Sequence, residues 1–362
     1  MLTLPDHRLV RLILSFLFCL ALISVGTEAK GESTEEMDEQ QISLEQGMEL
    51  SEQPIELEEE KKVLFADIDE EHWVFDDLEQ LVEKRVLVSS PDTHFEPDKR
   101  ITKADLIRLI LRAKGVYDPS VPFTHSRFND VPPESDTYPY IEIAYSMAIT
   151  SGDAQGNFNP LGAISRQEAI GLMIKALGKE EEAKRFPLID ETLASYADQA
   201  EITPVYREIL AYAVDQGFVA GMEREGKQFL EPRDFITRAE AAALVARFIL
   251  PELEGALVET VDGMEIYFKK KMEFEATAYS SEQPNLSKYT ATGLLVRHGI
   301  VSVNPEVIPF GTHLYIEGYG FAVAGDTGGS MLKNGQQIDL AFETVEEAIS
   351  FGRKKVQVYF LD

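Results

Sequence analysis

The sequence contains almost no cysteine: of its 362 residues, only Cys19 carries a thiol. Cys19 lies inside an apolar N-terminal run, and the bulky residues 16–18 before it lack the small-residue pattern that precedes a lipid-modified cysteine. Removal of that run would leave the exported chain without a thiol. Disulfide bonds, thiolate metal sites and cysteine nucleophiles are then excluded, and stability must come from packing alone.

Basic residues are scarce as well. The chain has 34 Lys and Arg residues against 63 Asp and Glu residues, a formal net charge of -29. Binding to nucleic-acid phosphates requires a basic face, so we expect no nucleic-acid partner. His298 and His313 have no Glu or His at ligand spacing, so we expect neither a metal site nor a cofactor. Any anionic ligand must therefore be bound by a few placed cations.

The N-terminal residues have the layout of a secretory signal peptide. Arg8 and Arg11 precede an apolar run over residues 12–25, and small and polar residues follow up to Ala29. The run is shorter than the roughly 20 residues of a bilayer span, so we expect cleavage of residues 1–29 and no stable membrane span afterwards. Residues 30–62 are rich in Glu, Gln, Ser and Asp, which predicts a disordered acidic spacer.

A threefold repeat follows. Each unit opens with an aromatic residue, then any residue, then Asp. These openings are Phe65-Ala-Asp67, Phe128-Asn-Asp130 and Tyr196-Ala-Asp198. The units close with Ile101-Thr-Lys-Ala-Asp105, Ile164-Ser-Arg-Gln-Glu168 and Ile236-Thr-Arg-Ala-Glu240. A Thr or Ser three residues before an acid is the capping-box pattern, and apolar residues at helical spacing come next. Each unit is therefore predicted to be a helix, a turn and a helix, and the units are predicted to stack on one another.

These openings and closings resemble the S-layer homology family. The resemblance implies repeats at residues 63–115, 126–178 and 194–250, which form an all-α helical pseudotrimer that binds pyruvylated secondary cell-wall polysaccharide. It also implies that the basic residue of each closing motif grips the acidic ketal: Lys103, Arg166 and Arg238. The alternative for these three residues is a solvated helix start.

Aromatic residues near the start of each unit are candidates for sugar stacking. Trp73 matches the usual residue of the family, whereas Tyr138 and Tyr206 are weaker candidates. An aromatic residue in a first helix can equally belong to the core.

Helical spacing gives way to short alternating segments after residue 250. Asp262-Gly263 lies between two such segments, which predicts a β-hairpin connector over residues 251–272. About six short strands with Gly and Pro between them, and one helix near residues 345–352, indicate a small closed barrel, because closure removes exposed strand edges.

Two carboxylates in this region stand in unusual contexts. Asp326 heads Asp-Thr-Gly-Gly, and Asp339 follows Ile338 on a predicted strand. On spacing alone, Asp326 could cap a loop and Asp339 could be an ordinary exposed residue. Aspartic proteases also contain Asp-Thr-Gly, but they need two such aspartates and no second copy exists in this chain.

A longer set of motifs resembles the 3D, or three-aspartate, domain. The set is Ala276-Thr-Ala-Tyr279, Thr290-Ala-Thr-Gly293, Val307-Ile-Pro-Phe-Gly311, Gly318-Tyr-Gly320, Asp326-Thr-Gly-Gly329, Ile338-Asp-Leu340 and Phe351-Gly-Arg353. The resemblance implies that residues 273–362 form a double-psi β-barrel similar to the catalytic barrel of membrane-bound lytic transglycosylase A. The expected fold class is therefore multidomain, an all-α pseudotrimer followed by a mainly-β barrel.

The same resemblance assigns roles to residues of the barrel. Asp339 matches the general acid and base, and Asp326 is the second catalytic aspartate. The substrate-binding candidates are Asn304, Tyr279, Thr292 and Thr327. Asn304 stands where the family has its first aspartate, and an amide cannot ionise. The segment 332–335 also lengthens the loop between the two aspartates.

Lytic cleavage needs one carboxylic acid, which protonates the glycosidic oxygen and then accepts the proton of the muramic acid C6 hydroxyl. Asn304 therefore need not prevent activity. The predicted function is a wall-anchored peptidoglycan lytic transglycosylase whose partners are peptidoglycan and the secondary wall polysaccharide. The alternative is a non-catalytic glycan-binding or scaffold protein with a degenerate barrel.

Overall fold

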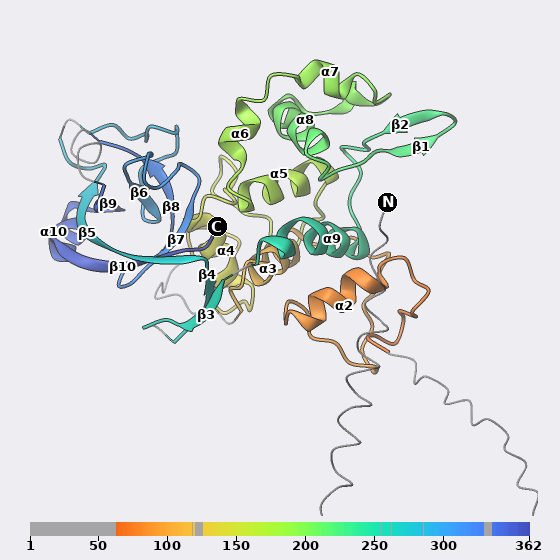
Figure 1. Cartoon of the computed structure of the whole chain (residues 1–362), viewed down its shortest axis with the longest axis horizontal. Coiled ribbons are helices and arrows are strands. Elements are labelled where there is room, and N and C mark those ends of the chain that lie inside the picture. Colours follow the sequence, from red (N-terminus) through yellow and green to blue (C-terminus); the bar gives the residue numbers. More distant parts are fainter. Residues whose placement is uncertain are drawn as a thin grey trace, which may run out of the picture. The chain divides into compact units, whose positions relative to one another are not determined.

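A computed structural model describes residues 63–362 apart from 118, 120–125, 254, 262, 285 and 329–334 (Figure 1). The predicted signal peptide, the predicted spacer and most of the lengthened loop at 332–335 lie outside the described residues. The chain divides into two units, Met1–Glu59 and Glu60–Asp362, and everything below belongs to the second. Among its described helices, none combines the length and apolar character needed to cross a bilayer.

The first two repeats each contain two helices. They are α2 (Phe75–Glu83), α3 (Lys103–Ala113), α4 (Tyr138–Ser146) and α5 (Arg166–Ala176). The capping interactions predicted from the closing motifs are present: the Thr102 hydroxyl accepts the Asp105 amide proton, and Ser165 and Glu168 form a capping box. These caps satisfy backbone N–H groups that have no partner inside the helix.

The third repeat is not all helical. The linker before it contains α6 (Glu180–Lys184) and α7 (Ile189–Leu193). The repeat itself contains η1 (Gln199–Glu201), η2 (Pro204–Tyr206), α8 (Arg207–Asp215), β1 (Met222–Arg224), β2 (Lys227–Phe229), α9 (Arg238–Leu244) and η3 (Val245–Ile249), and η4 (Leu250–Glu252) follows at its end. Glu225 and Gly226 both have positive φ, 52° and 74°, which a two-residue hairpin turn favours and a helix excludes. The prediction of an all-α repeat region is therefore wrong.

Short extended segments also join the repeats to one another. Isolated β-bridges pair Arg100 with Thr237, Thr102 with Ala163, and Ser165 with Phe235. Backbone hydrogen bonds continue the pattern: Lys103 N donates to Gly162 O, Arg166 N to Asp234 O, and Arg238 N to Lys99 O, over 2.8–2.9 Å. Repeat 1 thus binds repeat 2, repeat 2 binds repeat 3 and repeat 3 binds repeat 1, so the contacts close into a ring.

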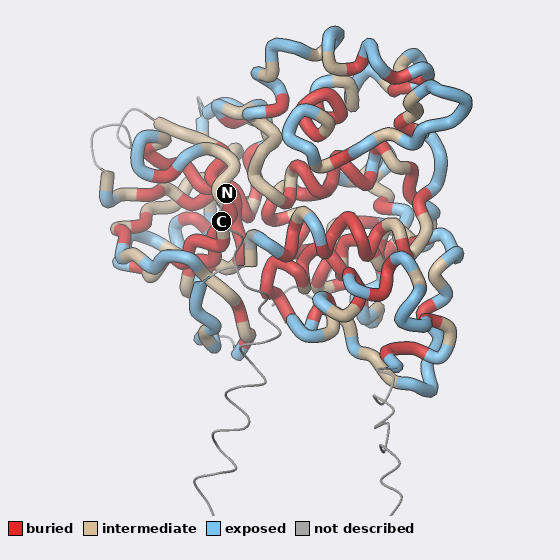
Figure 2. The backbone as a smooth tube through the Cα atoms, turned by 45° about the vertical axis from the view of Figure 1, so that its right-hand side comes forward, coloured by how far each residue is buried: buried red, intermediate tan, exposed pale blue. Residues whose placement is uncertain are grey.

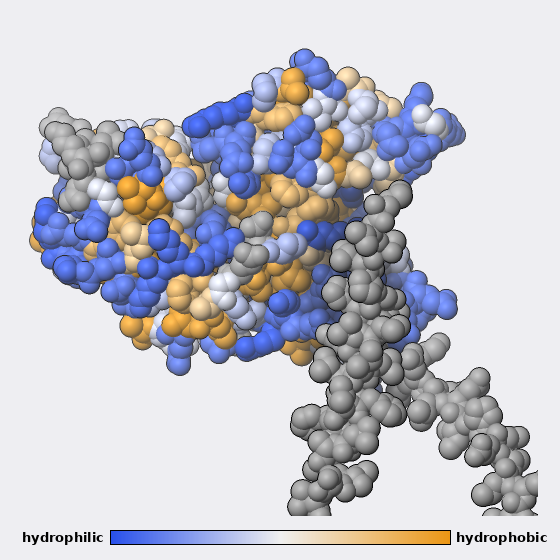
Figure 3. All heavy atoms as spheres, in the orientation of Figure 1, coloured by the Kyte–Doolittle hydropathy of each residue, from blue (hydrophilic) through white to orange (hydrophobic). Residues whose placement is uncertain are grey.

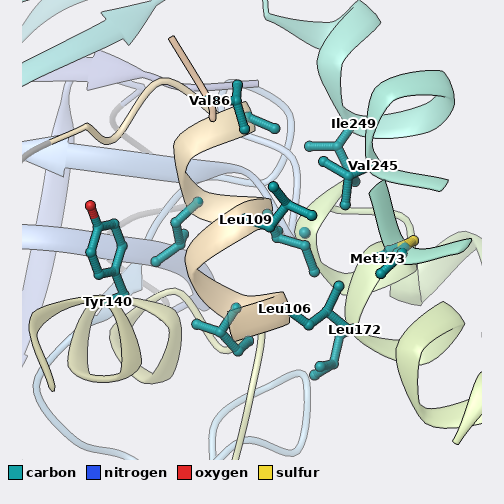
Figure 4. Close-up of a cluster of buried hydrophobic side chains, with 14 of the residues drawn as sticks. Val86, Leu106, Leu109, Tyr140, Leu172, Met173, Val245 and Ile249 are labelled. Carbon is teal, nitrogen blue, oxygen red and sulfur yellow. The ribbon is translucent and has the colours of Figure 1, made fainter. Parts of the chain in front are cut away.

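The core of the repeats is centred on α3, whose apolar stripe is completely buried. Figure 4 shows Leu106 and Leu109 of α3 close to residues of the second and third repeats, among them Leu172 and Val245. Each fully buried Leu or Ile contributes about 1.5–3 kcal/mol, so no repeat could retain this core alone. Buried residues, red in Figure 2, lie between the helices and inside the barrel, while Figure 3 shows many hydrophilic residues on one face of the surface.

The C-terminal region forms a hairpin and a closed barrel. The hairpin predicted around residues 262–263 consists of β3 (Ala256–Glu259) and β4 (Glu265–Phe268). The barrel strands are β5 (Lys270–Ser280), β6 (Ile300–Ser302), β7 (His313–Ile316), β8 (Gly320–Asp326), β9 (Gln337–Phe342) and β10 (Lys354–Phe360), in the order β10-β5-β9-β6-β8-β7. Pairing of β10 with β7 closes the barrel, and α10 (Val345–Phe351) precedes β10. Phe274, Val301 and Leu340 are among the residues that fill the interior.

The repeats and the barrel share a hydrophobic core. Tyr315, Phe321 and Tyr359 of the barrel belong to the same buried cluster as the helices of the repeats. Polar contacts cross the same boundary: Arg297 Nη2 donates to Tyr145 O over 2.5 Å, and His313 Nε2 lies 3.1 Å from Met147 O. The repeats and the barrel therefore pack against each other within one compact unit.

Gly299 offers a test of this boundary. Its φ is +92°, and a Cβ built there would lie 2.7–2.9 Å from atoms of Ser146 on the repeat side. Gly299→Ala should lower the free energy of unfolding by the backbone strain, about 1–3 kcal/mol, and further by the clash. Gly217→Ala is the matched control, since its φ is +74° with no atom within 4 Å. If chemical denaturation shows the same loss of unfolding free energy for both variants, the clash with Ser146 adds no cost and the contact between repeats and barrel is not tight at this point.

Candidate functional site

The sheet register brings the two predicted catalytic aspartates to either side of one strand. Ser302 of β6 pairs with Asp339 of β9 and with Asp326 of β8. Neighbouring strands lie about 4.7–4.9 Å apart, so the backbones of the two aspartates are roughly 10 Å apart. On the far side of β9, Thr277 of β5 pairs with Asp339. The four residues form a row across the barrel wall.

Asp339 lies in a half-buried position with one hydrogen bond. Thr277 Oγ1 donates to Asp339 Oδ1 over 2.8 Å. Burial raises the pKa of Asp339 and the charge of Asp326 adds to this rise, whereas the Thr277 hydrogen bond and Arg353 oppose it. The net rise means that Asp339 keeps its proton at a higher pH than an ordinary aspartate, which suits a proton donor.

Asp326 is surrounded by hydrogen-bond donors. Tyr279 Oη donates to Asp326 Oδ2 over 3.0 Å, and the amides of Ala291 and Thr327 donate to Oδ1 over 2.9 Å. Burial raises the pKa of Tyr279, and the Asp326 charge raises it further, so the phenol keeps its proton and remains a donor. Three donors are thus directed at this one carboxylate. The two aspartates thus occupy environments of opposite character.

Asn304 is engaged in a local turn. Its Oδ1 accepts the Glu306 amide proton over 2.9 Å, and its main-chain oxygen accepts from Val307 and Ile308. The side chain is buried. Its oxygen therefore caps the turn after β6, a structural role that was not predicted for it.

Thr292 and Thr327 brace the backbone beside Asp326. Thr292 Oγ1 donates to Gly325 O over 2.6 Å, and Thr327 Oγ1 donates to Val303 O over 2.7 Å. Both hydroxyl protons are thereby directed at main-chain carbonyls. The two threonines fix the loops that hold Asp326.

Thr277 and Ser302 were missed by the sequence analysis. Thr277 precedes Tyr279 by two residues, so alternation on a strand places both on one face. That signal could have added Thr277 to the candidates. Nothing local marks Ser302, whose position depends on which strands become neighbours.

The repeat cations do not project freely into solvent. Lys103 Nζ donates to Phe158 O over 3.0 Å and lies 4.2 Å from the centre of the Phe158 ring. Arg238 Nε donates to Phe95 O over 2.7 Å, and the guanidinium carbon lies 5.1 Å from the centre of the Phe95 ring. Burial lowers the pKa of Lys103, although acidic neighbours oppose this. Each cation is thus half-buried against the neighbouring repeat, contrary to the solvated alternative.

Arg166 differs from the other two. The residue equivalent to Phe158 in the third repeat is Leu230, which offers no ring. Arg166 Nη1 lies 3.6 Å from Glu240, and its Nε is buried without a hydrogen-bond partner among the described residues. An unsatisfied buried N–H costs about 1–3 kcal/mol, and a ligand acceptor would remove that cost.

Two of the inter-repeat grooves contain cavities. Groove 1 has a volume of about 70 Å³ and is lined by Phe95, Ile101, Asp105, Arg108, Arg112 and Arg238, among others. Groove 2 has a volume of about 120 Å³ and is lined by Lys103, Thr150, Glu168, Gly171, Lys175 and Tyr206, among others. Arg108, which lines groove 1, pairs with Asp105 and Asp136, whereas the equivalent residue in groove 2 is Gly171. Groove 2 is therefore the more open.

The candidate stacking aromatics have three different environments. Trp73 is 56% exposed, and Tyr206 lines groove 2. Tyr138 is buried in the core as the first residue of α4, the position that Phe75 has in α2. Tyr138 therefore packs inside the protein, where no sugar can reach it.

The histidines of the barrel have structural environments. Burial, with the charges of Arg127 and Arg297, lowers the pKa of His298 to about 3, and its ring stacks on Tyr319 at 4.2 Å. Over the described part of the chain, no three His, Cys, Asp or Glu residues come together as metal ligands.

Comparison with known proteins identifies parts of this architecture. The S-layer homology domain matches residues 64–107 and 127–170, and the 3D domain matches residues 300–362. Neither match reaches the third predicted repeat. The sequence is 28% identical over 186 residues to "Exoglucanase XynX" of Acetivibrio thermocellus, which covers 51% of this chain and 16% of that protein.

The C-terminal part has a different relative. It is 37% identical over 97 residues to "Cell wall-binding protein YocH" of Bacillus subtilis (strain 168), covering 26% of this chain and 33% of that protein. A crystal structure of E. coli MltA with bound chitohexaose overlaps 34% of this chain and 35% of that chain, with 17% identity and a TM-score of 0.18. The chain thus spans a third or less of the length of these two curated relatives. It contains S-layer homology domains and a 3D domain.

Proposed function

We propose that this is a cell-wall-attached lytic transglycosylase of the bacterial surface. Its repeats, bounded at 63–115, 126–178 and 194–250, bind secondary cell-wall polysaccharide, and its barrel at 273–362 cleaves peptidoglycan glycan strands. The observation that carries the proposal is the contrast between Asp339, whose pKa is raised by burial, and Asp326, which accepts three hydrogen bonds. The S-layer homology and 3D matches, and a relative named as cell wall-binding, support the location.

The reaction follows from the two environments. Protonated Asp339 gives its proton to the glycosidic oxygen, and the bond from that oxygen to C1 of muramic acid breaks. Asp339, now a carboxylate, accepts the proton of the C6 hydroxyl while O6 bonds to C1. The products are a free sugar hydroxyl and a 1,6-anhydro end, and no water is consumed. Asp326, positioned by hydrogen bonds from Tyr279 and two amides, stabilises the positive charge that develops at C1.

Asn304 favours a second candidate, a non-catalytic glycan-binding or scaffold protein. Its side chain caps a turn, so the residue at the first family position supplies no charge to the site. This candidate predicts a folded barrel that binds glycan strands and leaves them intact.

Asp339→Asn tests the assignment of the acid. The amide cannot donate and recover the proton, so release of anhydro-muropeptides from purified peptidoglycan should fall by about 10²–10⁴-fold, as measured by mass spectrometry. Glu346→Gln, an exposed carboxylate on α10, is the control and should leave the rate unchanged. Undiminished product from Asp339→Asn would contradict the mechanism, and no product from the native chain would favour the scaffold.

Asn304→Asp tests the electrostatics. Asp keeps the oxygen that caps the turn, and its added negative charge should raise the pKa of Asp339 further. A raised pKa preserves the acid form to higher pH, so the alkaline limb of the pH-rate profile should shift upward. An unchanged profile would place the new charge too far from Asp339 to matter.

Replacement of Lys103, Arg166 and Arg238 by Gln tests the anchoring role. Each loss of a charge-assisted contact should weaken binding to purified cell walls, by about three- to tenfold for each residue. Lys103 and Arg238 also bond to neighbouring repeats, so thermal unfolding must be followed in parallel. Arg166→Gln is the cleanest variant because its Nε has no partner among described residues. Lys99→Gln, an exposed cation paired with Glu96, is the control; equal binding by the triple variant would contradict the proposal.

A further inference from the structure

One residue of the second repeat lines two separate cavities. Lys175, near the end of α5, borders groove 2 and also a cleft between the repeats and the barrel. The cleft is lined from the repeat side by Met147, Lys175 and Lys184, and from the barrel side by Thr292, Leu294 and Gly325, among others. Lys175 is therefore where an inter-repeat groove meets the barrel.

The barrel side of this cleft adjoins the carboxylate site. Thr292, which lines the cleft, donates its hydroxyl proton to Gly325 O, and Gly325 immediately precedes Asp326. Ala291, the residue before Thr292, donates its amide proton to Asp326 itself. The cleft thus leads from Lys175 to the backbone that holds Asp326.

The chemistry of the lining suits a hydroxyl- and amide-bearing polymer. Lys184 Nζ lies 2.8 Å from Glu181 and 3.5 Å from Glu180, and Lys175 Nζ lies 3.8 Å from Glu180. Two ammonium groups balance two carboxylates, so neither a simple anion nor a simple cation is favoured. Apolar residues such as Met147, Leu294 and Val323 line the cleft beside these charged groups, and a sugar presents both apolar C–H faces and hydroxyl or N-acetyl groups to such a lining.

The dimensions allow substituents of a sugar to enter. The cleft has a volume of about 40 Å³ and groove 2 about 120 Å³. A water molecule needs roughly 10–15 Å³ of such space, so both hollows have room for several waters. Hydroxyl or amide groups of a strand lying along the surface can replace these waters.

Groove 2 and the cleft keep a fixed spacing because hydrogen bonds, an ion pair and ring contacts join the repeats to the barrel. Arg297 donates to Tyr145 O and lies 3.8 Å from the centre of the Tyr145 ring. Arg127 Nη1 lies 2.7 Å from Glu343. A polymer bound in groove 2 would therefore meet the barrel at a constant position.

We propose that groove 2 and the cleft form one extended binding path for a wall glycan strand whose other end lies at Asp326 and Asp339. The second repeat then binds the substrate of the barrel as well as anchoring the protein. This inference rests on the proposed function for the identity of the strand.

Lys184 and Lys179 provide a matched pair for the test. Their side chains are 43% and 42% exposed, and each pairs with a glutamate of α6, Lys184 with Glu181 over 2.8 Å and Lys179 with Glu182 over 2.9 Å. Lys184 lines the cleft and Lys179 is not among its lining residues. Acidic neighbours raise the pKa of Lys184 against the opposing effect of burial, so it carries its charge.

The binding experiment uses the full chain with Asp339→Asn, which removes cleavage. Long soluble glycan strands released from purified walls, and a tetrasaccharide from the same strands, are titrated by calorimetry. Lys184→Gln should raise the Kd for long strands by about three- to tenfold with a smaller effect on the tetrasaccharide, and Lys179→Gln should match the parent. Equal Kd values for all three chains, or an equal loss for long strands and tetrasaccharide, would overturn the path.

A cleavage experiment separates this inference from the proposed function. In chains with Asp339 intact, Lys184→Gln should lower the ratio of long-strand to tetrasaccharide turnover by a similar factor, and Lys179→Gln should preserve it. If no chain releases anhydro products while the binding difference holds, the proposed cleavage fails and the path stands as a glycan-binding site. If long strands do not bind the full chain at all, the path itself is refuted.

Discussion

The closing motif of each repeat is the constraint on which the helical half depends. The motif caps a helix and donates backbone hydrogen bonds to the adjacent repeat, and in the first and third repeats it also directs a cation against the loop of that neighbour. Lys103 illustrates all three: it follows the cap residue Thr102, its amide bonds to Gly162 O and its ammonium group bonds to Phe158 O. Because these contacts close a ring, a change in one motif affects two repeats.

The barrel depends on a comparable constraint, the position of β6 between β8 and β9. Register sets which side chains share a face, and a slip of one residue would turn them to the other face. Pairing of Ser302 with both Asp326 and Asp339 fixes the distance between the two carboxylates and lets one influence the pKa of the other. Their different environments then come from neighbours on other strands, Thr277 for one and Tyr279 for the other.

Local signals predicted local structure well. Caps at Thr102, Ser165 and Thr237 marked helix starts because a side chain and an amide three residues away suffice to form them. The β1–β2 hairpin was missed although Glu225-Gly226 carried its signal, since the repeat pattern suggested a simple helix-helix loop. Tyr138 was grouped with Trp73 as an early aromatic residue of its repeat, whereas both the distance from the opening motif and the helix start pair it with the buried Phe75.

Long-range features could not be read from the sequence. The bridges between repeats, the shared core and the row through Ser302 each join residues far apart in the chain, and no local preference encodes such pairings. Asn304 shows why the role of a site residue is hard to predict. Its family position suggested contact with substrate, whereas in the structure its side-chain oxygen accepts a hydrogen bond in the turn after β6. Residue type constrains the chemistry of a position, and only its neighbours decide which chemistry is used.

Two carboxylates of the barrel region, Asp362 and Asp339, respond to pH in opposite ways. Burial alone would raise the pKa of Asp362, but the charges of His313 and Lys114 hold it well below the usual range. Its contribution to stability is therefore present at neutral pH and is lost as pH falls through the folded-state value. Asp339 has a raised pKa, so its contribution is lost as pH rises through that value. The boundary between repeats and barrel thus gains stability from an ionised carboxylate, while the candidate site gives up stability to keep a carboxylic acid protonated. A half-buried acid whose pKa is raised on balance costs stability once it ionises, and a protein tolerates that cost at a functional site when the surrounding packing compensates for it.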